Sequence, residues 1–160
     1  MLEKYFEDEV RDGFYVPSMI KRSWAVALDV LSEVDRICRK YDIKYYAEWG
    51  TLLGAVRHAG FVPWDDDLDI AMPRNDYIKF CQVAKQELKN GYEIFNFKNH
   101  DNFHHFLARV VCTSRICFED KYLKEHYGFP YIVGLDIFVH DNVSKDGKAQ
   151  EQNEKIAEYI

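Results

Sequence analysis

Four aspartates, Asp65, Asp66, Asp67 and Asp69, fall within five residues of this sequence, directly beside apolar residues suited to a protein core. Carboxylates this close repel one another, and burying an unpaired carboxylate is costly. A cation bound between them would offset both costs. Asp65 and Asp66 follow Trp64 in a predicted turn, where aspartate is also common because its side chain bonds nearby backbone amides. For these two residues a structural and a functional interpretation therefore both stay open.

The segment 66–72, DDLDIAM, alternates like a strand, which places Asp67 and Asp69 on one face, about 6.6 Å apart along the chain. Asp136 lies in GLDIFVH between Leu135 and Ile137, two residues expected to face the core. Carboxylate oxygens suit Mg²⁺, with Mn²⁺ as an alternative, and three acids would also allow a site for two ions. We therefore expect Asp67, Asp69 and Asp136 to be the metal ligands and catalytic residues of one site.

Five other residues are predicted to bind the substrate. Gly50 and Thr51 end a predicted strand and open a helix, where backbone N–H groups and the helix dipole favour a phosphate. Arg57 and His58 lie about two turns into that helix and could reach the same phosphates, although Arg57 could equally be solvated or paired with a carboxylate. Arg109, in FLARVV, is expected on the face of the acids, where it would neutralise them or hold the donor.

The apolar pattern predicts helices packed on a mixed β-sheet, an α/β or α+β fold. A long amphipathic helix is expected from Ser18 to about Asp42, with Ser18 as N-cap and Trp24 in the core. The other predicted helices cover 51–60, 74–89 and a polar terminal stretch at about 148–160. Strands are predicted at 43–49, 66–72, 92–97, 105–111, 115–119 and 134–140.

The chain has 160 residues, 48% of them apolar, and we expect one domain over 1–160 with an N-terminal extension at about 1–17. A formal net charge of −6 argues against a general nucleic-acid surface. No apolar run approaches the roughly 20 residues of a transmembrane segment, and the acidic N-terminus does not look like a signal peptide.

Four cysteines without a CxxC pair favour a reduced compartment, and we expect the cytoplasm. Cys38 and Cys81 occupy apolar positions of helical patterns and are expected to be small buried hydrophobes. A Cys112–Cys117 bond across a hairpin is a minor alternative.

Residues 50–80, GTLLGAVRHAGFVPWDDDLDIAMPRNDYIKF, closely resemble the LicD family of phosphocholine transferases, which share a nucleotidyltransferase-like fold. The flanking YYAEWG and GLDIFVHD extend the resemblance from about Asp42 to Asp141. It implies transfer of phosphocholine from CDP-choline to a hydroxyl of a cell-surface glycan, such as a teichoic acid precursor or lipopolysaccharide, with release of CMP. Carried over by position, it assigns the metal acids to Asp67, Asp69 and Asp136 and the phosphate-holding turn to Gly50–Thr51.

Members of the family usually run longer, so the chain is expected to be a fragment or a minimal version. A lipid-linked acceptor would bring it to the inner membrane face as a peripheral protein. Two other functions stay open: a nucleotidyltransferase that moves a nucleoside monophosphate to a small hydroxyl or amine, and a non-catalytic nucleotide-binding module. A choline group would call for an aromatic cage. The candidate rings, each expected in the core rather than in a cage, are Tyr45, Tyr46, Trp49, Trp64, Tyr127 and Tyr131.

Overall fold

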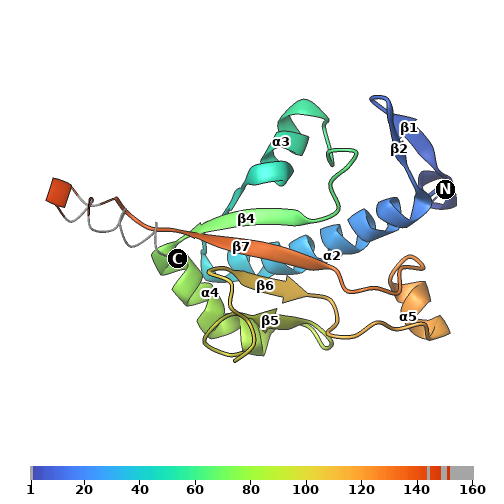
Figure 1. Ribbon diagram of the computed structural model, residues 1–160. Helices are drawn as coiled ribbons and strands as arrows, with labels where there is room; N and C mark the ends of the chain where they lie inside the picture. Colours follow the sequence, from blue (N-terminus) through green and yellow to red (C-terminus); the bar gives the residue numbers. More distant parts are fainter. Residues whose placement is uncertain (1, 144, 149–150, 152–160) are drawn as a thin grey trace.

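The protein is described by a computed structural model that covers residues 2–143, 145–148 and 151 (Figure 1). Most of the terminal helix predicted at about 148–160 lies outside the described residues. The elements in chain order are α1 (Leu2–Tyr5), β1 (Glu9–Arg11), β2 (Phe14–Val16), α2 (Ser18–Tyr41), β3 (Tyr46–Ala47), α3 (Trp49–Arg57), β4 (Leu68–Pro73), α4 (Arg74–Glu87), β5 (Glu93–Phe95), β6 (Ala108–Val111), α5 (Asp120–Glu125) and β7 (Gly134–His140).

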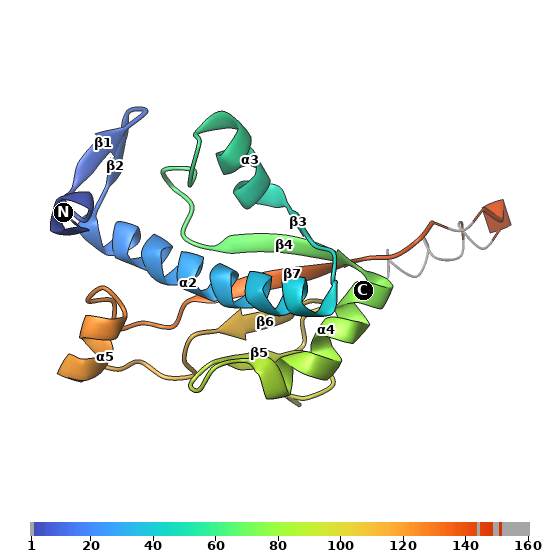
Figure 2. The same ribbon diagram turned by 180° about the vertical axis from the view of Figure 1, so that it is seen from behind.

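Five strands form one mixed sheet in the order β3-β4-β7-β6-β5. The central pair β4 and β7 is parallel, and the other neighbours are antiparallel. Helices α2 and α4 lie behind the sheet in Figure 1 and in front of it in the reverse view of Figure 2, whereas α3 lies beside β4. The predicted α/β (α+β) class with a mixed sheet flanked by helices is therefore confirmed.

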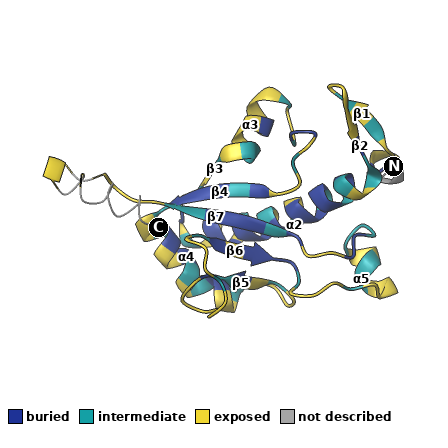
Figure 3. Ribbon diagram, viewed as in Figure 1, coloured by how far each residue is buried: buried dark blue, intermediate teal, exposed yellow. Residues whose placement is uncertain are grey.

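The core lies between the sheet and α2. Helix α2 buries an apolar stripe that includes Val26, Val30, Val34 and Ile37, as its helical spacing requires. Alternate residues of β4 and β7 meet this stripe, so the centre of the sheet is buried in Figure 3. The opposite side chains of β4 and β7 consequently point to the face turned away from α2 and α4, which we call the open face.

The long helix predicted from Ser18 is confirmed, and Trp24 is fully buried in it. Ser18 as N-cap is wrong, because the cap position is Pro17 and the Ser18 N–H donates to the Asp8 carboxylate at 2.6 Å. Asp42 ends the helix with a left-handed φ of 50°. The Asp8 carboxylate therefore caps the start of the helix in place of the Ser18 hydroxyl.

The strand predicted at 115–119 is wrong. The Cys117 N–H donates to the Pro130 carbonyl and the Cys112 N–H to the Val133 carbonyl, so isolated bonds to 130–133 replace a ladder there. All four cysteines are free, and the alternative of a Cys112–Cys117 bond is not realised. Cys38 is buried as predicted, whereas Cys81 is half-buried against the core.

The predicted N-terminal extension contains the β1–β2 hairpin, which lies at the N-terminal end of α2. Lys21 of α2, only 3% exposed, attaches the N-terminal segment to the helix. Its ammonium donates to the Glu9 carboxylate and to the Glu7 carbonyl, both at 2.9 Å. Among the described residues, no helix combines the length and the apolar character that crossing a bilayer requires.

Candidate active site

Charged side chains form a row across the open face of the sheet. The register pairs Asp69 of β4 with Asp136 of β7, and Asp136 in turn with Arg109 of β6. Glu48 extends the row at the other side, since its backbone N–H donates to the Asp69 carbonyl at 3.1 Å. Side chains opposite each other on neighbouring strands share a face. The sheet therefore holds three acids and one arginine in a line.

Asp67 completes the predicted triad from the residue just before β4. Carboxylate oxygens of Asp67, Asp69 and Asp136 all lie within 4.8 Å of one another. Leu135 and Ile137 are fully buried on the opposite face, as the alternation predicted. The three acids singled out in the sequence are thus brought together, and their catalytic role stays a prediction.

The triad is held in an unfavourable electrostatic state. Burial, followed by the nearby charge of Asp65, raises the pKa of Asp67 to about 6. Burial, followed by the charges of Asp67 and Asp136, raises the pKa of Asp69 to about 6 as well. Like charges this close disfavour ionisation, and a bound cation would reverse that effect. The site is therefore built to receive positive charge.

Arg109 supplies part of that charge. Its Nε and Nη2 donate to the two oxygens of Asp136 at 2.5 and 2.6 Å, a bidentate pair. The Asp136 side chain is 10% exposed and that of Arg109 45% exposed, so the guanidinium also reaches the surface. The bonds to Asp136 raise the pKa of the guanidinium above its usual value. The predicted placement of Arg109 on the face of the acids is confirmed.

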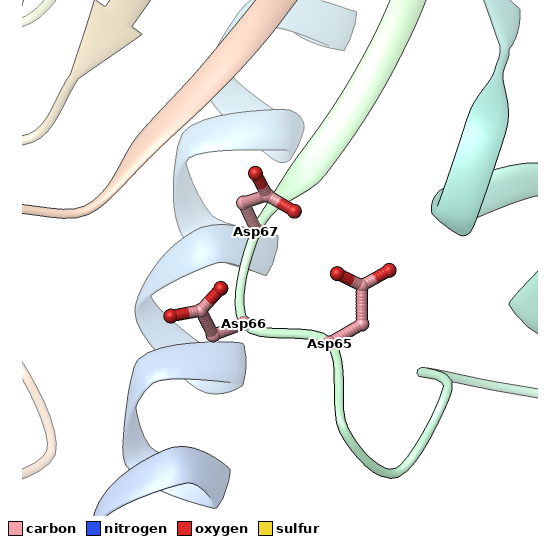
Figure 4. Close-up of side chains that lie close together, drawn as sticks. All are labelled: Asp65, Asp66 and Asp67. Carbon is pink, nitrogen blue, oxygen red and sulfur yellow. The ribbon is translucent and has the colours of Figure 1, made fainter.

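Asp65 and Asp66 lie on opposite sides of the segment that leads into β4. Figure 4 shows the side chains of Asp65 and Asp66 leaving the backbone on different sides, with Asp67 further along the chain. These three residues also bring carboxylate oxygens within 4.8 Å of one another. The Asp65 side chain packs against Gly50, where an added Cβ would overlap its carboxylate. Gly50 is therefore required for the approach of Asp65, whatever it does for a phosphate.

Thr51 links α3 to the acids. Its hydroxyl oxygen accepts a hydrogen bond from the Asp69 N–H at 2.8 Å, so it fixes the start of β4 beneath the triad. The preceding Trp49 has a φ of 46°, a left-handed conformation that is strained for a bulky residue and turns the chain sharply into the helix. Gly50 and Thr51 thus lie beside the acids, and the binding of a phosphate there stays a prediction.

Arg57 and His58 contact residues outside the acidic triad. His58 lies 2.9 Å from the Asp12 carboxylate of the N-terminal hairpin, and Arg57 donates to the His58 ring at 2.8 Å. The Arg57 guanidinium also lies 5.7 Å from the centre of the Trp64 ring. Among the described residues, neither side chain contacts the triad. The binding of a phosphate by Arg57 or His58 stays a prediction.

The acids lie between two cavities, which the sequence did not indicate. A cavity of about 580 Å³ is lined by Gly50, Thr51, Asp65 and Asp67 together with apolar residues of α2, α3 and the loop after it. A second cavity, of about 380 Å³, is lined by Ser23, Asp66, Asp67, Arg109 and Asp136 and by residues 129 and 131–134. A third, of about 590 Å³ between 89–93 and 112–126, includes no member of the triad.

Two features of the site were missed. Glu48, at the end of β3, pairs one oxygen with His140 Nε2 at 2.8 Å, while its second oxygen has no partner among the described residues. The sequence pointed to Glu48 only through its place near the end of a predicted strand. The cage candidates are also mostly not in the core, since Tyr46, Trp49, Trp64 and Tyr131 are exposed. Tyr45 and Tyr127 pack against the core, as expected.

The residues present fit a divalent metal ion of the hard type. Three carboxylates converge, their oxygens are the ligands that Mg²⁺ prefers, and two of them have pKa values raised by crowding. Asp67 lines both of the cavities beside the acids, and Asp136 lines the one of about 380 Å³.

Comparison with known proteins agrees with the site. Residues 42–156 match the model of a family described as LicD/FKTN/FKRP, nucleotidyltransferase domain. The lipopolysaccharide cholinephosphotransferase LicD of Haemophilus influenzae is 32% identical over 130 residues, 81% of this chain and 47% of that protein. Uncharacterised proteins of Rickettsia typhi and Rickettsia prowazekii are 46% and 43% identical over 86 and 65 residues, about a quarter of each.

The chain therefore spans about half, or less, of the curated relatives that it matches. The family match covers well over half of the chain and includes every member of the acidic row. The chain belongs to the LicD family.

Proposed function

We propose that this chain carries the catalytic site of a transferase that moves phosphocholine from CDP-choline to a hydroxyl of lipopolysaccharide or another cell-surface glycan, such as a teichoic acid precursor, and releases CMP. The observation that carries the proposal is the convergence of three carboxylate oxygens within 4.8 Å beside an arginine, in a chain related to a cholinephosphotransferase. Phosphoryl transfer needs this combination of positioned positive charge and shielding of anionic oxygens.

Asp67, Asp69 and Asp136 would hold Mg²⁺ or Mn²⁺ in this proposal. When bound, such an ion neutralises the pyrophosphate of the donor and the charge that develops on the leaving CMP. Thr51 keeps Asp69 in place through its bond to the Asp69 amide. Arg109, whose side chain is 45% exposed, orients Asp136 and is close enough to the acids to contact a phosphate oxygen.

In the transfer, the acceptor oxygen forms a bond to the choline-bearing phosphorus, and the bond from that phosphorus to the CMP oxygen breaks. The acceptor hydroxyl gives its proton to a carboxylate of the site. Asp136 is a candidate for that task only if Arg109 releases it, because Arg109 binds both of its oxygens.

Transfer of a nucleoside monophosphate is a second candidate, favoured by the description of the matching family as a nucleotidyltransferase domain. The same acids would serve it, because the ion and the in-line geometry are common to both reactions. The two differ in their products. Transfer of phosphocholine releases CMP, whereas transfer of the cytidylyl group releases phosphocholine.

The test is to incubate the chain with CDP-choline and Mg²⁺, with and without lipopolysaccharide, and to quantify CMP and phosphocholine separately. We expect metal-dependent CMP release that falls at least about 100-fold in Asp69→Asn. Asp101→Asn, a change of an exposed aspartate in the 99–103 turn, is the matched control and should leave the rate unchanged. Release of phosphocholine would favour the second candidate, and turnover unaffected by Asp69→Asn would contradict both.

A further inference from the structure

The cavity of about 380 Å³ has a chemical character that the proposed reaction does not by itself require. Asp66, Asp67 and Asp136 line one part of it, and the rings of Phe129 and Tyr131 line another. Because Asp67 and Asp136 belong to the triad, the cavity opens directly onto the site of phosphoryl transfer. A group bound in this cavity would lie next to the reacting phosphorus.

Its aromatic part is built from rings that meet at steep angles. Phe129 and Tyr131 have centroids 5.4 Å apart and planes inclined by 71°. Phe118 continues the cluster against Tyr131 at 6.3 Å and 81°. Tyr131 is 44% exposed, so its ring is accessible to a ligand. An exposed aromatic ring can attract a quaternary ammonium ion placed over its face, so Tyr131 is the ring of this cluster best placed to do so.

The charged part is anionic. Asp66 is exposed and has no hydrogen bond or ion pair within the described part of the chain, and its side chain leaves the backbone on the other side of the segment from that of Asp65 (Figure 4). Among the residues lining the cavity, Arg109 is the only base, and it is bound to Asp136. A carboxylate that lacks a donor suits a cation that carries no N–H group, since such a cation interacts through charge alone.

In the cavity of about 580 Å³ (the larger cavity), both aromatic rings already have partners within the protein. The face of Phe61 is stacked on Trp24 at 4.9 Å with planes 8° apart. The ammonium of Lys21 lies 5.1 Å from the centre of the Tyr5 ring. A second cation there would compete with Lys21. The smaller cavity is therefore the better receptor for an organic cation.

We propose that the cavity lined by Asp66, Phe129 and Tyr131 binds the trimethylammonium group of the donor and sets the preference for choline over a primary amine. Phe129 and Tyr131 contact the methyl groups, and Asp66 provides the compensating charge. The larger cavity then remains for the other parts of the two substrates. This inference rests on the proposed function, because it assigns the choline end of CDP-choline.

The test measures the affinity of CDP-choline and of CDP-ethanolamine by calorimetry in the presence of Mg²⁺. In Tyr131→Ala and Asp66→Asn we expect the affinity for CDP-choline to fall roughly 3- to 30-fold and the preference over CDP-ethanolamine to shrink. Tyr131→Phe should retain the preference, because it keeps the ring. Phe97→Ala removes another exposed ring, which lies outside the cavity, and should change neither affinity.

An unchanged ratio of the two affinities in both Tyr131→Ala and Asp66→Asn would overturn the subsite while leaving the proposed function intact. The same holds if these variants raise only the KM for the glycan, which would assign the cavity to the acceptor. A wild-type chain without affinity for CDP-choline would instead overturn the proposed function and the subsite together.

Discussion

At the scale of single residues, the site gathers more negative charge than it balances. Asp67, Asp69 and Asp136 come together, and within the described ranges Arg109 is the one base that forms an ion pair with them; Asp136 and Asp69 are direct cross-strand neighbours. Like charges placed opposite each other destabilise a sheet. Such an arrangement lowers stability in exchange for a binding site, which is a common compromise at functional positions.

Arg109→Met should therefore destabilise the protein. It leaves the Asp136 carboxylate, 10% exposed, beside two other acids without its bidentate partner. We expect a loss of about 2 kcal/mol in the free energy of unfolding at neutral pH, measured by urea denaturation in a chelating buffer. Arg115→Met, an exposed arginine whose guanidinium has no described partner, is the control. Equal stability of the two variants would show that Arg109 does not hold Asp136.

The raised pKa values of Asp67 and Asp69 predict how stability varies with pH. Between about pH 4 and pH 6 these two groups bind more protons in the folded state than in the unfolded state. Their contribution to the free energy of unfolding therefore falls as the pH rises through this window and stays low above it. The double variant Asp67→Asn/Asp69→Asn should lose this slope and exceed the wild type in stability at neutral pH.

The measurement is urea unfolding in a chelating buffer across this pH range, compared between wild type and double variant so that other titrating groups cancel. A double variant that is less stable than the wild type at neutral pH would contradict the electrostatic account. Addition of Mg²⁺ should stabilise the wild type above pH 6 and have a smaller effect below it, because protons then compete for the same oxygens.

At the scale of elements, the acids are positioned by contacts between α3 and β4. The bond from the Asp69 N–H to Thr51 Oγ1, at 2.8 Å, is a direct link between these two elements. The Asp65 side chain fills the space at Gly50 from the other side. The turn after β3 therefore sets the position of β4, and the function of Gly50 and Thr51 is at least partly to place the acids.

Thr51→Val tests this link, because valine keeps the shape and removes the acceptor. We expect it to cost about 1–2 kcal/mol in the free energy of unfolding, with a larger proportional loss of CMP release than Thr51→Ser, which keeps the hydroxyl. Urea denaturation and turnover are measured on both variants. If the serine and valine variants behave alike, the hydroxyl does not position Asp69.

The elements that carry strong periodicity were predictable from the sequence. The apolar stripe of α2 and the alternation around Asp69 and Asp136 each reflect burial on one face, a local signal. The row that joins Asp136 to Arg109 was only partly predictable, because strand order depends on contacts distant in sequence. The missing strand at 115–119 and the role of Asp8 as the acceptor for Ser18 have the same origin, since both depend on tertiary partners.

At the scale of the whole molecule, the open face of the sheet contains the acidic row, and α2 and α4 cover the other face (Figures 1 and 2). Asp67 lines two separate cavities, and in the proposed transfer these would be separate places for the donor and the acceptor. The 130 residues aligned with the Haemophilus cholinephosphotransferase cover 47% of that protein, and all three acids of the triad lie in the described part of the present chain. Metal binding should therefore be measurable on this chain.

The most direct test of the account is to titrate the chain with Mn²⁺, followed by electron paramagnetic resonance, and with Mg²⁺, followed by calorimetry, at neutral pH. We expect saturable binding in the wild type, a loss of at least about 100-fold in affinity for Asp67→Asn/Asp69→Asn, and no change for Asp101→Asn. Binding of equal strength in the wild type and the double variant would show that these acids do not hold the metal, and would contradict the central claim.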